Sequence, residues 1–208
     1  MKTKYHIQIT EAALNGQFSS KALNLILEAN IGQDSLVFQV GHDHFHYDND
    51  SFQQADAYVE KLRNDCLEQI RQAKLIDAWR SYGRLTHTIQ DFYAHSNYIE
   101  IMLKESPGAE DLPIREPGSK LPDGIRSGKL YYPWEVITFI PGFPEKIKEF
   151  FPPDSHARMN KDAPERKYFK EAFKLAVSAT LQELGKITMQ LSDYDKLAFF
   201  DKADHHKQ

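Results

Sequence analysis

The sequence predicts a mostly α-helical fold, a single-domain helical bundle that carries a long, proline-rich irregular insert. Three observations support this prediction. All ten prolines lie between residues 107 and 164, and proline breaks helices because it lacks a backbone N–H donor. Outside that stretch, apolar residues recur at the spacing of an amphipathic helix. Strand signals are confined to two short and isolated β-branched runs, residues 36–40 and 136–140.

Helices are expected along the whole first half of the chain. The first covers residues 9–14, and the second runs from a cap at Ser19 or Ser20 to about residue 30. The third covers residues 52–74, and the fourth covers residues 76–103 without interruption. Their apolar positions follow a period near 3.6 and include Ala55, Val59, Leu62, Cys66, Ile70, Leu85, Ile89, Phe92 and Ile99. Because Cys66 belongs to such an apolar face, we expect it in the core.

A proline-rich insert, residues 105–163, separates these helices from a last one that begins after Pro164. We expect the stretch 107–163 to form no long helix, to cover part of a cleft as a lid, and to return a metal ligand to the site. Its many aromatic residues argue against disorder, and they include Tyr131, Tyr132, Trp134, Phe139, Phe143, Phe150 and Phe151. Such rings pack onto helices, line a cleft or anchor in a lipid interface.

Composition and charge restrict the class of protein. The 208 residues are 41% hydrophobic and 27% charged, which is typical of a soluble globular domain. A net charge of −4 argues against a nucleic-acid partner, although bound metal ions would supply local positive charge to a nuclease. The single cysteine excludes an intrachain disulfide. Neither a signal peptide nor an apolar run of membrane-spanning length is visible, so we expect a cytoplasmic location.

Histidine and aspartate form a stripe on the fourth expected helix. His87, Asp91 and His95 are four residues apart, and positions i, i+4 and i+8 lie on one face of an α-helix. Two imidazoles and a carboxylate are ligands that zinc accepts. The alternative is a polar helix face whose hydrogen bonds are satisfied within the protein.

Two further clusters lie before and after this stripe. In residues 42–50, six of nine side chains can bind a metal, and an extended backbone would place His42, His44, His46 and Asp48 on one side. Asn30 and Asp34 form a neighbouring ligand pair at i, i+4. The later cluster, residues 154–162, contains His156, Asn160 and Asp162, and His6 precedes the first expected helix. The alternatives are a solvated polar loop for residues 42–50 and a loop histidine for His156.

Taken together, these motifs resemble the zinc-dependent phospholipase C and single-strand nuclease superfamily, and they are most similar to its heterokaryon-incompatibility C-like branch. Residues 83–97 resemble the signature helix of that superfamily, and residues 46–49 resemble its His-Phe-Asp-Asn motif. Residues 6–14 are similar to its opening motif, residues 29–34 to its second, and residues 156–162 to its closing motif.

The resemblance implies a phospholipase C/nuclease-like helical fold, residues 1–208 as one metal-dependent phosphoesterase-like domain, and a zinc cluster of two or three ions. It implies a first site with the ligands Asp34, His46, His87 and Asp91. A second site takes His95, His156 and either Asn160 or Asp162, and a third takes His6 and Asp91. His44 is an alternative to His46, because residues 43–45 also resemble the motif.

These ligands predict zinc-dependent hydrolysis of a phosphate ester, foremost a phosphodiester, in a phospholipase C-like reaction. Two ions about 3.5–4 Å apart clamp the ester and generate a hydroxide that attacks phosphorus. Asp34 is the expected catalytic residue, because a carboxylate beside the ions orients the nucleophile. The expected partner is a small-molecule or lipid phosphoester substrate, with peripheral membrane contact through the aromatic insert. The alternatives are iron or manganese chemistry on a small molecule, and an inactive metal-binding or interaction protein.

Overall fold

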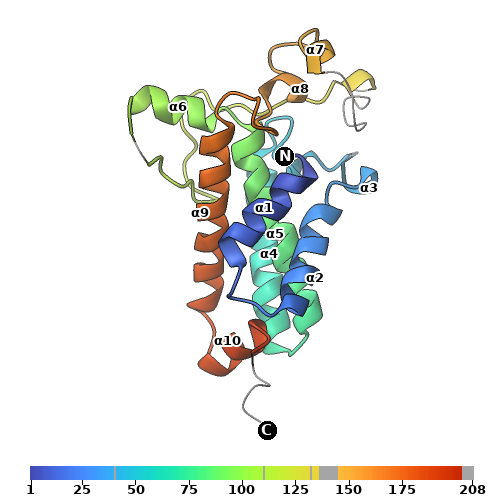
Figure 1. Cartoon of the computed structure of the whole chain (residues 1–208), viewed down its shortest axis with the longest axis vertical. Helices are drawn as coiled ribbons and strands as arrows, with labels where there is room; N and C mark the ends of the chain where they lie inside the picture. The colour runs from blue at the N-terminus through green and yellow to red at the C-terminus, as the bar shows by residue number, and fades with distance from the viewer. Residues whose placement is uncertain (40, 110, 132, 136–144, 203–208) are drawn as a thin grey trace.

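The computed structural model is mostly helical, as the sequence predicts, and it describes residues 1–39, 41–109, 111–131, 133–135 and 145–202 (Figure 1). Within these residues no strand is formed, and β-type pairing is limited to isolated bridges between Ser96 and Ser127 and between Lys129 and Ser155. The elements in chain order are α1 Thr3–Leu14, α2 Ser20–Gly32, α3 Leu36–Gln39, the 3-10 turn η1 Asp43–Phe45, α4 Phe52–Arg71, α5 Leu75–His95, α6 Tyr98–Glu105, α7 Glu145–Lys148, α8 His156–Met159, α9 Phe169–Thr188 and α10 Asp193–Phe199.

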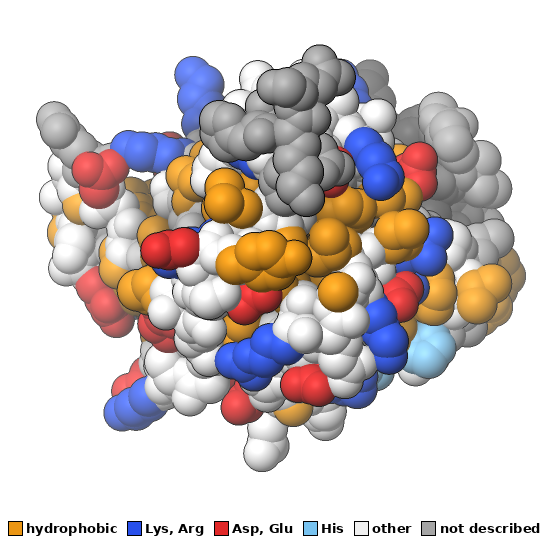
Figure 2. Space-filling view, turned by 90° about the horizontal axis from the view of Figure 1, so that it is seen from below, with side chains coloured by type: hydrophobic (Ala, Val, Ile, Leu, Met, Phe, Trp, Pro, Cys, Tyr) orange, Lys and Arg blue, Asp and Glu red, His pale blue; other side chains and the backbone are white. Residues whose placement is uncertain are grey.

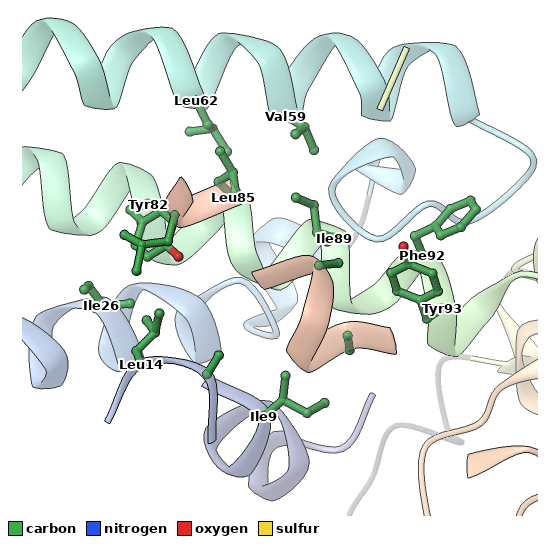
Figure 3. Packing of buried hydrophobic residues seen from close by; sticks show 14 of the residues in the cluster. Ile9, Leu14, Ile26, Val59, Leu62, Tyr82, Leu85, Ile89, Phe92 and Tyr93 are labelled. Atoms are coloured by element: carbon green, nitrogen blue, oxygen red, sulfur yellow. The ribbon is translucent and has the colours of Figure 1, made fainter. Parts of the chain in front are cut away.

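Helix α5 is the central element of the bundle and packs against α2, α4 and α9 (Figure 1). From residue 81 to residue 95 every side chain of α5 is buried except that of Arg84. Figure 3 shows Leu85 and Ile89 of α5 facing Leu62 and Val59 of α4 in the hydrophobic core. Because the C-terminal part of α5, from residue 85 to residue 95, is buried throughout, His87, Asp91 and His95 are held inside the protein.

Gly83 allows α2 and α5 to cross closely. A Cβ atom at this position would lie 2.3 Å from the carbonyl oxygen of Ile26 and 2.9 Å from the Cβ of Ala29. Only glycine fits a contact of this kind, in which one helix backbone touches the next. The close crossing sets how near the end of α2, and hence Asp34, lies to α5.

The expected secondary structure was wrong or incomplete at several places. Helix α1 begins at Thr3 rather than near residue 9, because Tyr5 and Ile9 continue one buried face. The run 36–40, which has β-branched residues, contains a short helix, α3, rather than a strand. The other β-branched run, 136–140, lies outside the described residues. The last expected helix is followed by a separate one, α10, whose N-cap is the Ser192 hydroxyl.

The long helix expected over residues 76–103 is broken after His95. Ser96 is extended (φ −99°, ψ 163°), and α6 begins at Tyr98. The insert supplies the backbone partners at the break: the Gly128 amide donates to the His95 carbonyl at 3.0 Å, and the Asn97 amide donates to the Arg126 carbonyl at 3.0 Å. Pairing with the insert therefore replaces the next helical turn, a long-range effect that helical periodicity cannot reveal.

The described part of the insert contains only the short helices α7 and α8. Its middle and its end lie together, because a Cβ on Gly128 would come within 2.5 Å of the His156 Cα. The Lys129 carbonyl accepts a 2.8 Å hydrogen bond from the His156 amide. Gly128 is in turn bonded to His95, so the insert carries His156 to the C-terminal end of α5.

The two ends of the bundle are formed by different elements. Figure 1 places the N-terminus of the chain with α3 and α8 at one end, and α10 at the other. Figure 2, seen from the α10 end, shows hydrophobic side chains gathered between charged ones. Exposed apolar residues of α10 are Tyr194 and Leu197. No helix within the described residues has both the length and the apolar character that a membrane span requires.

Candidate metal centre

One buried carboxylate, Asp91, lies at the centre of a group of four histidines. Its Oδ2 is 2.9 Å from His87 Nε2 and 3.0 Å from His46 Nδ1. Its Oδ1 is 3.2 Å from His6 Nε2 and 3.5 Å from His95 Nε2. His87, Asp91 and His95 project from one face of α5, while His6 comes from α1 and His46 follows η1. The stripe predicted on the fourth helix therefore faces the interior.

Ligand-type atoms converge in three overlapping groups. His46, His87 and Asp91 form the first, and His6 and Asp34 join His87 in the second. The third consists of Asp48, His95 and His156. Within each group one nitrogen or carboxylate oxygen per residue lies within 4.8 Å of the others, which is the spread that a shared ion requires.

The outward-facing nitrogens of three histidines are already bonded to the protein. His6 Nδ1 is 2.7 Å from Gln90 Oε1, His46 Nε2 is 3.3 Å from the Phe38 carbonyl, and His95 Nδ1 is 3.1 Å from the His46 carbonyl. Oxygen acceptors fix the N–H on these nitrogens. The second nitrogen of His6 and of His46 is thereby left as a lone pair that faces Asp91, and His95 Nε2 also faces Asp91. Metal-binding histidines are oriented in this way.

Some polar atoms of the cluster have no hydrogen-bond partner. Among the described residues these include the buried His87 Nδ1. His6 Nε2 and Asp162 Oδ1 form no hydrogen bond either, but they lie 3.2 Å from Asp91 Oδ1 and 3.3 Å from the Met1 nitrogen. Leaving such an atom unsatisfied costs about 1–3 kcal/mol. Imidazole nitrogens and carboxylate oxygens are the donor set of zinc, iron and manganese sites. The residues present therefore fit a group of transition-metal ions.

A second layer of polar residues holds His6 in place. Gln90 accepts from His6 and donates to the hydroxyls of Thr10 and Thr180 at 3.0 and 3.2 Å. Asn30, expected as a ligand, lies in this layer and donates to Thr86 and Gln90. Sequence analysis did not identify Gln90. The sequence feature that could have identified Gln90 is its position three residues after His87, because residues i and i+3 lie on the same face of a helix.

Burial and the nearby carboxylates shift the pKa values of His87 and His95 in opposite directions. Burial lowers the pKa of His87 to about 4, against the opposing effect of Asp91, so this imidazole is neutral and can bind an ion. For His95, burial opposes the charged form, but Asp91 and Asp48 raise the pKa to about 10. The pKa of Asp91 stays well below its usual range despite burial, because His95 and other positive groups surround it.

The Met1 nitrogen also lies in this cluster. It is 2.6 Å from Asp91 Oδ1, 3.3 Å from Asp162 Oδ1 and 3.0 Å from His95 Nε2. Burial disfavours its charge, but the carboxylates of Asp162, Asp91 and Asp34 outweigh that effect and raise its pKa to about 11. The nitrogen therefore neutralises part of the negative charge at the centre.

His44 was predicted as an alternative to His46, but the structure does not bring it into the cluster. The extended, alternating backbone assumed for residues 42–50 is wrong, because residues 43–45 form the 3-10 turn η1 and Tyr47 has a φ of 56°. As a result His44 packs against the rings of Phe45 and Tyr58, with centroid distances of 4.5 and 5.6 Å. Of the three histidines in this run, His46 is the one that is buried.

The same turn brings in a residue that the predicted ligand set omitted. Asp48 Oδ1 lies 2.9 Å from His156 Nδ1 and 3.3 Å from His95 Nδ1. The polar run 42–50 indicated that a ligand lies in this segment. Which of its residues point inward depends on the turn, which the sequence pattern does not reveal.

Of the two late candidates, Asp162 reaches the cluster and Asn160 does not. Asp162 Oδ1 is 3.5 Å from His95 Nε2. The Asn160 amide instead donates to the carbonyls of His156 and Ala157 and so stabilises α8. Asp34, the predicted catalytic residue, lies at the edge: its Oδ1 is 3.7 Å from His87 Nε2, and its side chain is 22% exposed.

Comparison with known proteins points to a family other than the one expected. A sequence model of the family described as VWA7 N-terminal domain matches residues 4–116. Von Willebrand factor A domain-containing protein 7 from Rattus norvegicus is 30% identical over 97 residues, which are 45% of this chain and 11% of that protein. The chain thus spans about a tenth of the length of this relative. No solved structure matches.

These matches overturn the expected resemblance to the phospholipase C and single-strand nuclease superfamily. The expectation of a phospholipase C-like phosphodiesterase is therefore wrong. Membership of that superfamily no longer supports a hydrolase function either. The motif spacings resembled that superfamily because any helix that presents i, i+4 and i+8 ligands shares them. The matched stretch 4–116 includes the cluster residues His6, Asp34, His46, Asp48, His87, Asp91 and His95, whereas His156 and Asp162 lie beyond it.

Proposed function

The chain belongs to the VWA7 N-terminal domain family, and from this premise and the geometry of the cluster we propose that it binds transition-metal ions, zinc foremost, and uses them to hydrolyse a phosphate ester. One observation carries the proposal. His6, His46 and His95 each turn one ring nitrogen toward an oxygen of the protein and the other toward Asp91. Buried imidazoles with a purely structural role have no need to direct their lone pairs at one carboxylate.

The proposed centre holds two or three ions. His46, His87 and Asp91 would hold one, and Asp48, His95 and His156 would hold another. His6 and Asp34 offer a further position, which shares His87 with the first. Asp91 has an oxygen facing each side of the centre, so it can bridge neighbouring ions. Iron or manganese would accept the same donors.

Hydrolysis is the chemistry that best suits a centre of this composition. When bound, such ions lower the pKa of a water molecule and polarise a phosphoryl oxygen. Enzymes that hold two metal ions close together mainly catalyse displacement at phosphorus or attack on amides. Asp34 is the carboxylate that we assign to orient the nucleophilic water, because it borders the centre and is open to solvent, whereas Asp91 is fully buried. Thr3 donates a 3.3 Å hydrogen bond that holds Asp34 Oδ2.

The test begins with metal content. Protein purified without a nickel column is analysed by mass spectrometry of its metals, and is then assayed with bis-nitrophenyl phosphate, a chromogenic phosphocholine ester, single-stranded DNA and a nitroanilide. We expect bound zinc and release of product from a phosphate ester. His87→Ala should lose metal and activity together, and the matched control His44→Ala, on the other side of the same turn, should keep both.

Asp34→Asn separates binding from turnover if His87→Ala fails to fold. We expect it to retain most of the metal and to lose about 100-fold or more in rate, as for other residues that position a nucleophile. Metal without turnover on any substrate would indicate a binding protein rather than an enzyme. Iron or manganese in place of zinc would favour a different reaction on a small molecule. No metal at all would refute the proposal.

A further inference from the structure

A pocket next to the metal centre has no role in the proposed function so far. It is formed between α2, α3 and α5 and has a volume of about 180 Å³. One hydrogen bond and one chain connection link it to the centre. Phe38 lines the pocket, and its carbonyl accepts the hydrogen bond from His46 Nε2. Gln33 also lines it and directly precedes Asp34 in the chain. The pocket and the centre therefore share part of one wall.

The charge of this pocket comes from two arginines of α5. Arg80 and Arg84 are four residues apart, on the same face of the helix, and both line the pocket. No carboxylate lies within ion-pairing distance of Arg84 among the residues that the structure describes, and Arg80 is 3.9 Å from Asp77 at the limit of such a pair. Glu28 lines the pocket too, but it forms an ion pair with neither arginine in the described chain.

The position of these arginines is built into the helix packing. Arg84 is exposed, although every other residue from 81 to 95 is buried. Gly83 lies between the two arginines and brings α2 against α5, so the guanidinium groups border the crossing of the two helices. An uncompensated guanidinium beside a pocket is an anion-binding arrangement, because its N–H donors match the oxygens of phosphate or carboxylate.

We propose that this pocket binds a second anionic group of the substrate, a phosphate or a carboxylate, while the bond to be cleaved is held at the metal centre. This inference rests on the proposed function. Arg84 and Asp91 are seven residues apart on α5, so the two residues lie about 10 Å from each other along the helix axis. The small volume suits one such group rather than a whole ligand.

Anion binding is tested first, by a measurement that requires no turnover. Sulfate, a dianion of suitable size, is titrated into the metal-loaded protein and the arginine Nε–H signals are followed by NMR. We expect a saturable shift of the Arg84 signal. Arg84→Gln should weaken sulfate binding about tenfold, the loss of one charge-assisted contact, while Arg71→Gln on the exposed end of α4 should leave it unchanged. Equal binding by all three proteins, or sulfate shifts confined to the cluster histidines, would overturn the proposal.

The link to the substrate is tested with two nitrophenyl phosphodiesters that differ only in a second phosphate on the other arm. Wild-type protein should show a KM about tenfold lower for the doubly charged ester, and Arg84→Gln should reduce that ratio to near one. An equal ratio in both proteins would refute the role of the pocket in substrate binding. If neither ester is cleaved, the proposed function fails, and the sulfate titration then decides separately whether the pocket binds anions.

Discussion

His46 Nδ1 and His87 Nε2 lie 3.1 Å apart in the buried centre, and each is about the same distance from one oxygen of Asp91. The proton of His46 is on its other nitrogen, which faces the Phe38 carbonyl. Its Nδ1 is therefore a lone pair directed at His87 and Asp91. Two nitrogens and one carboxylate oxygen that meet in this way are arranged to share a cation.

Replacing Asp91 should remove the metal ions together rather than one at a time. The Asp91→Asn side chain keeps the volume but loses the charge that four imidazoles surround. We expect loss of most bound zinc and a lower melting temperature, because ligation is coupled to folding. Metal analysis and thermal denaturation measure both effects. Asp77→Asn, a half-exposed position on the same helix, is the control, and a variant at 91 with full metal content would contradict the bridging role.

Asp48→Asn should instead remove a single ion. Asp48 belongs to the group with His95 and His156 and is absent from the other two groups. We therefore expect the metal stoichiometry to fall by about one ion per chain while the ion at His46 and His87 is retained. The surface variant Asp65→Asn controls for loss of an aspartate elsewhere. A stoichiometry equal to that of the wild type would exclude Asp48 as a ligand.

Sequence reasoning was most successful where structure is local. The i, i+4, i+8 spacing of His87, Asp91 and His95 predicts a shared helix face, and the fold confirms that they share one. The proline distribution likewise predicts where helices stop. Both signals depend on residues close together in the chain.

The parts that sequence reasoning missed depend on contacts between distant segments. The break after His95 arises from pairing with Gly128 and Arg126, and nothing in the 76–103 periodicity encodes it. The choice of His46 over His44 follows from the turn η1 and from the left-handed residues Tyr47 and Asn49 that come after it, which are not glycines. The family assignment was wrong for a related reason: ligand spacing reports helix geometry, which unrelated proteins share.

The crossing of α2 and α5 makes a prediction about stability that is independent of metal. Gly83→Ala would place a Cβ 2.3 Å from the Ile26 carbonyl, and the two backbones cannot separate without opening the core. We expect a loss of about 1–3 kcal/mol or more in the free energy of unfolding, measured by urea denaturation. Gly185→Ala in α9 is the matched control, because nothing lies within 4 Å of its added Cβ.

The two substitutions should differ in sign. In a helix interior without a clash, alanine is favoured over glycine by about 0.5–1 kcal/mol, so the Gly185→Ala variant should be more stable than the wild type. Equal effects at the two positions would mean that α2 and α5 do not pack as closely as Gly83 indicates.

The thiol of Cys66 offers a direct measure of how far bound metal stabilises the fold. It is the single cysteine of the chain, it is fully buried on α4, and burial raises its pKa well above the usual value. A thiol reagent at pH 8 should therefore react only with molecules that have opened. Removing metal with a chelator should speed labelling about 100-fold for each independently bound ion that was present at 100 times its dissociation constant. In Asp91→Asn, the variant expected to lose most of its zinc, the chelator should have little effect, and in urea-unfolded protein labelling should be fast with or without it. If the folded wild type is labelled slowly both with and without the chelator, the cluster stabilises the protein without bound ions. That result would contradict the proposed metal centre.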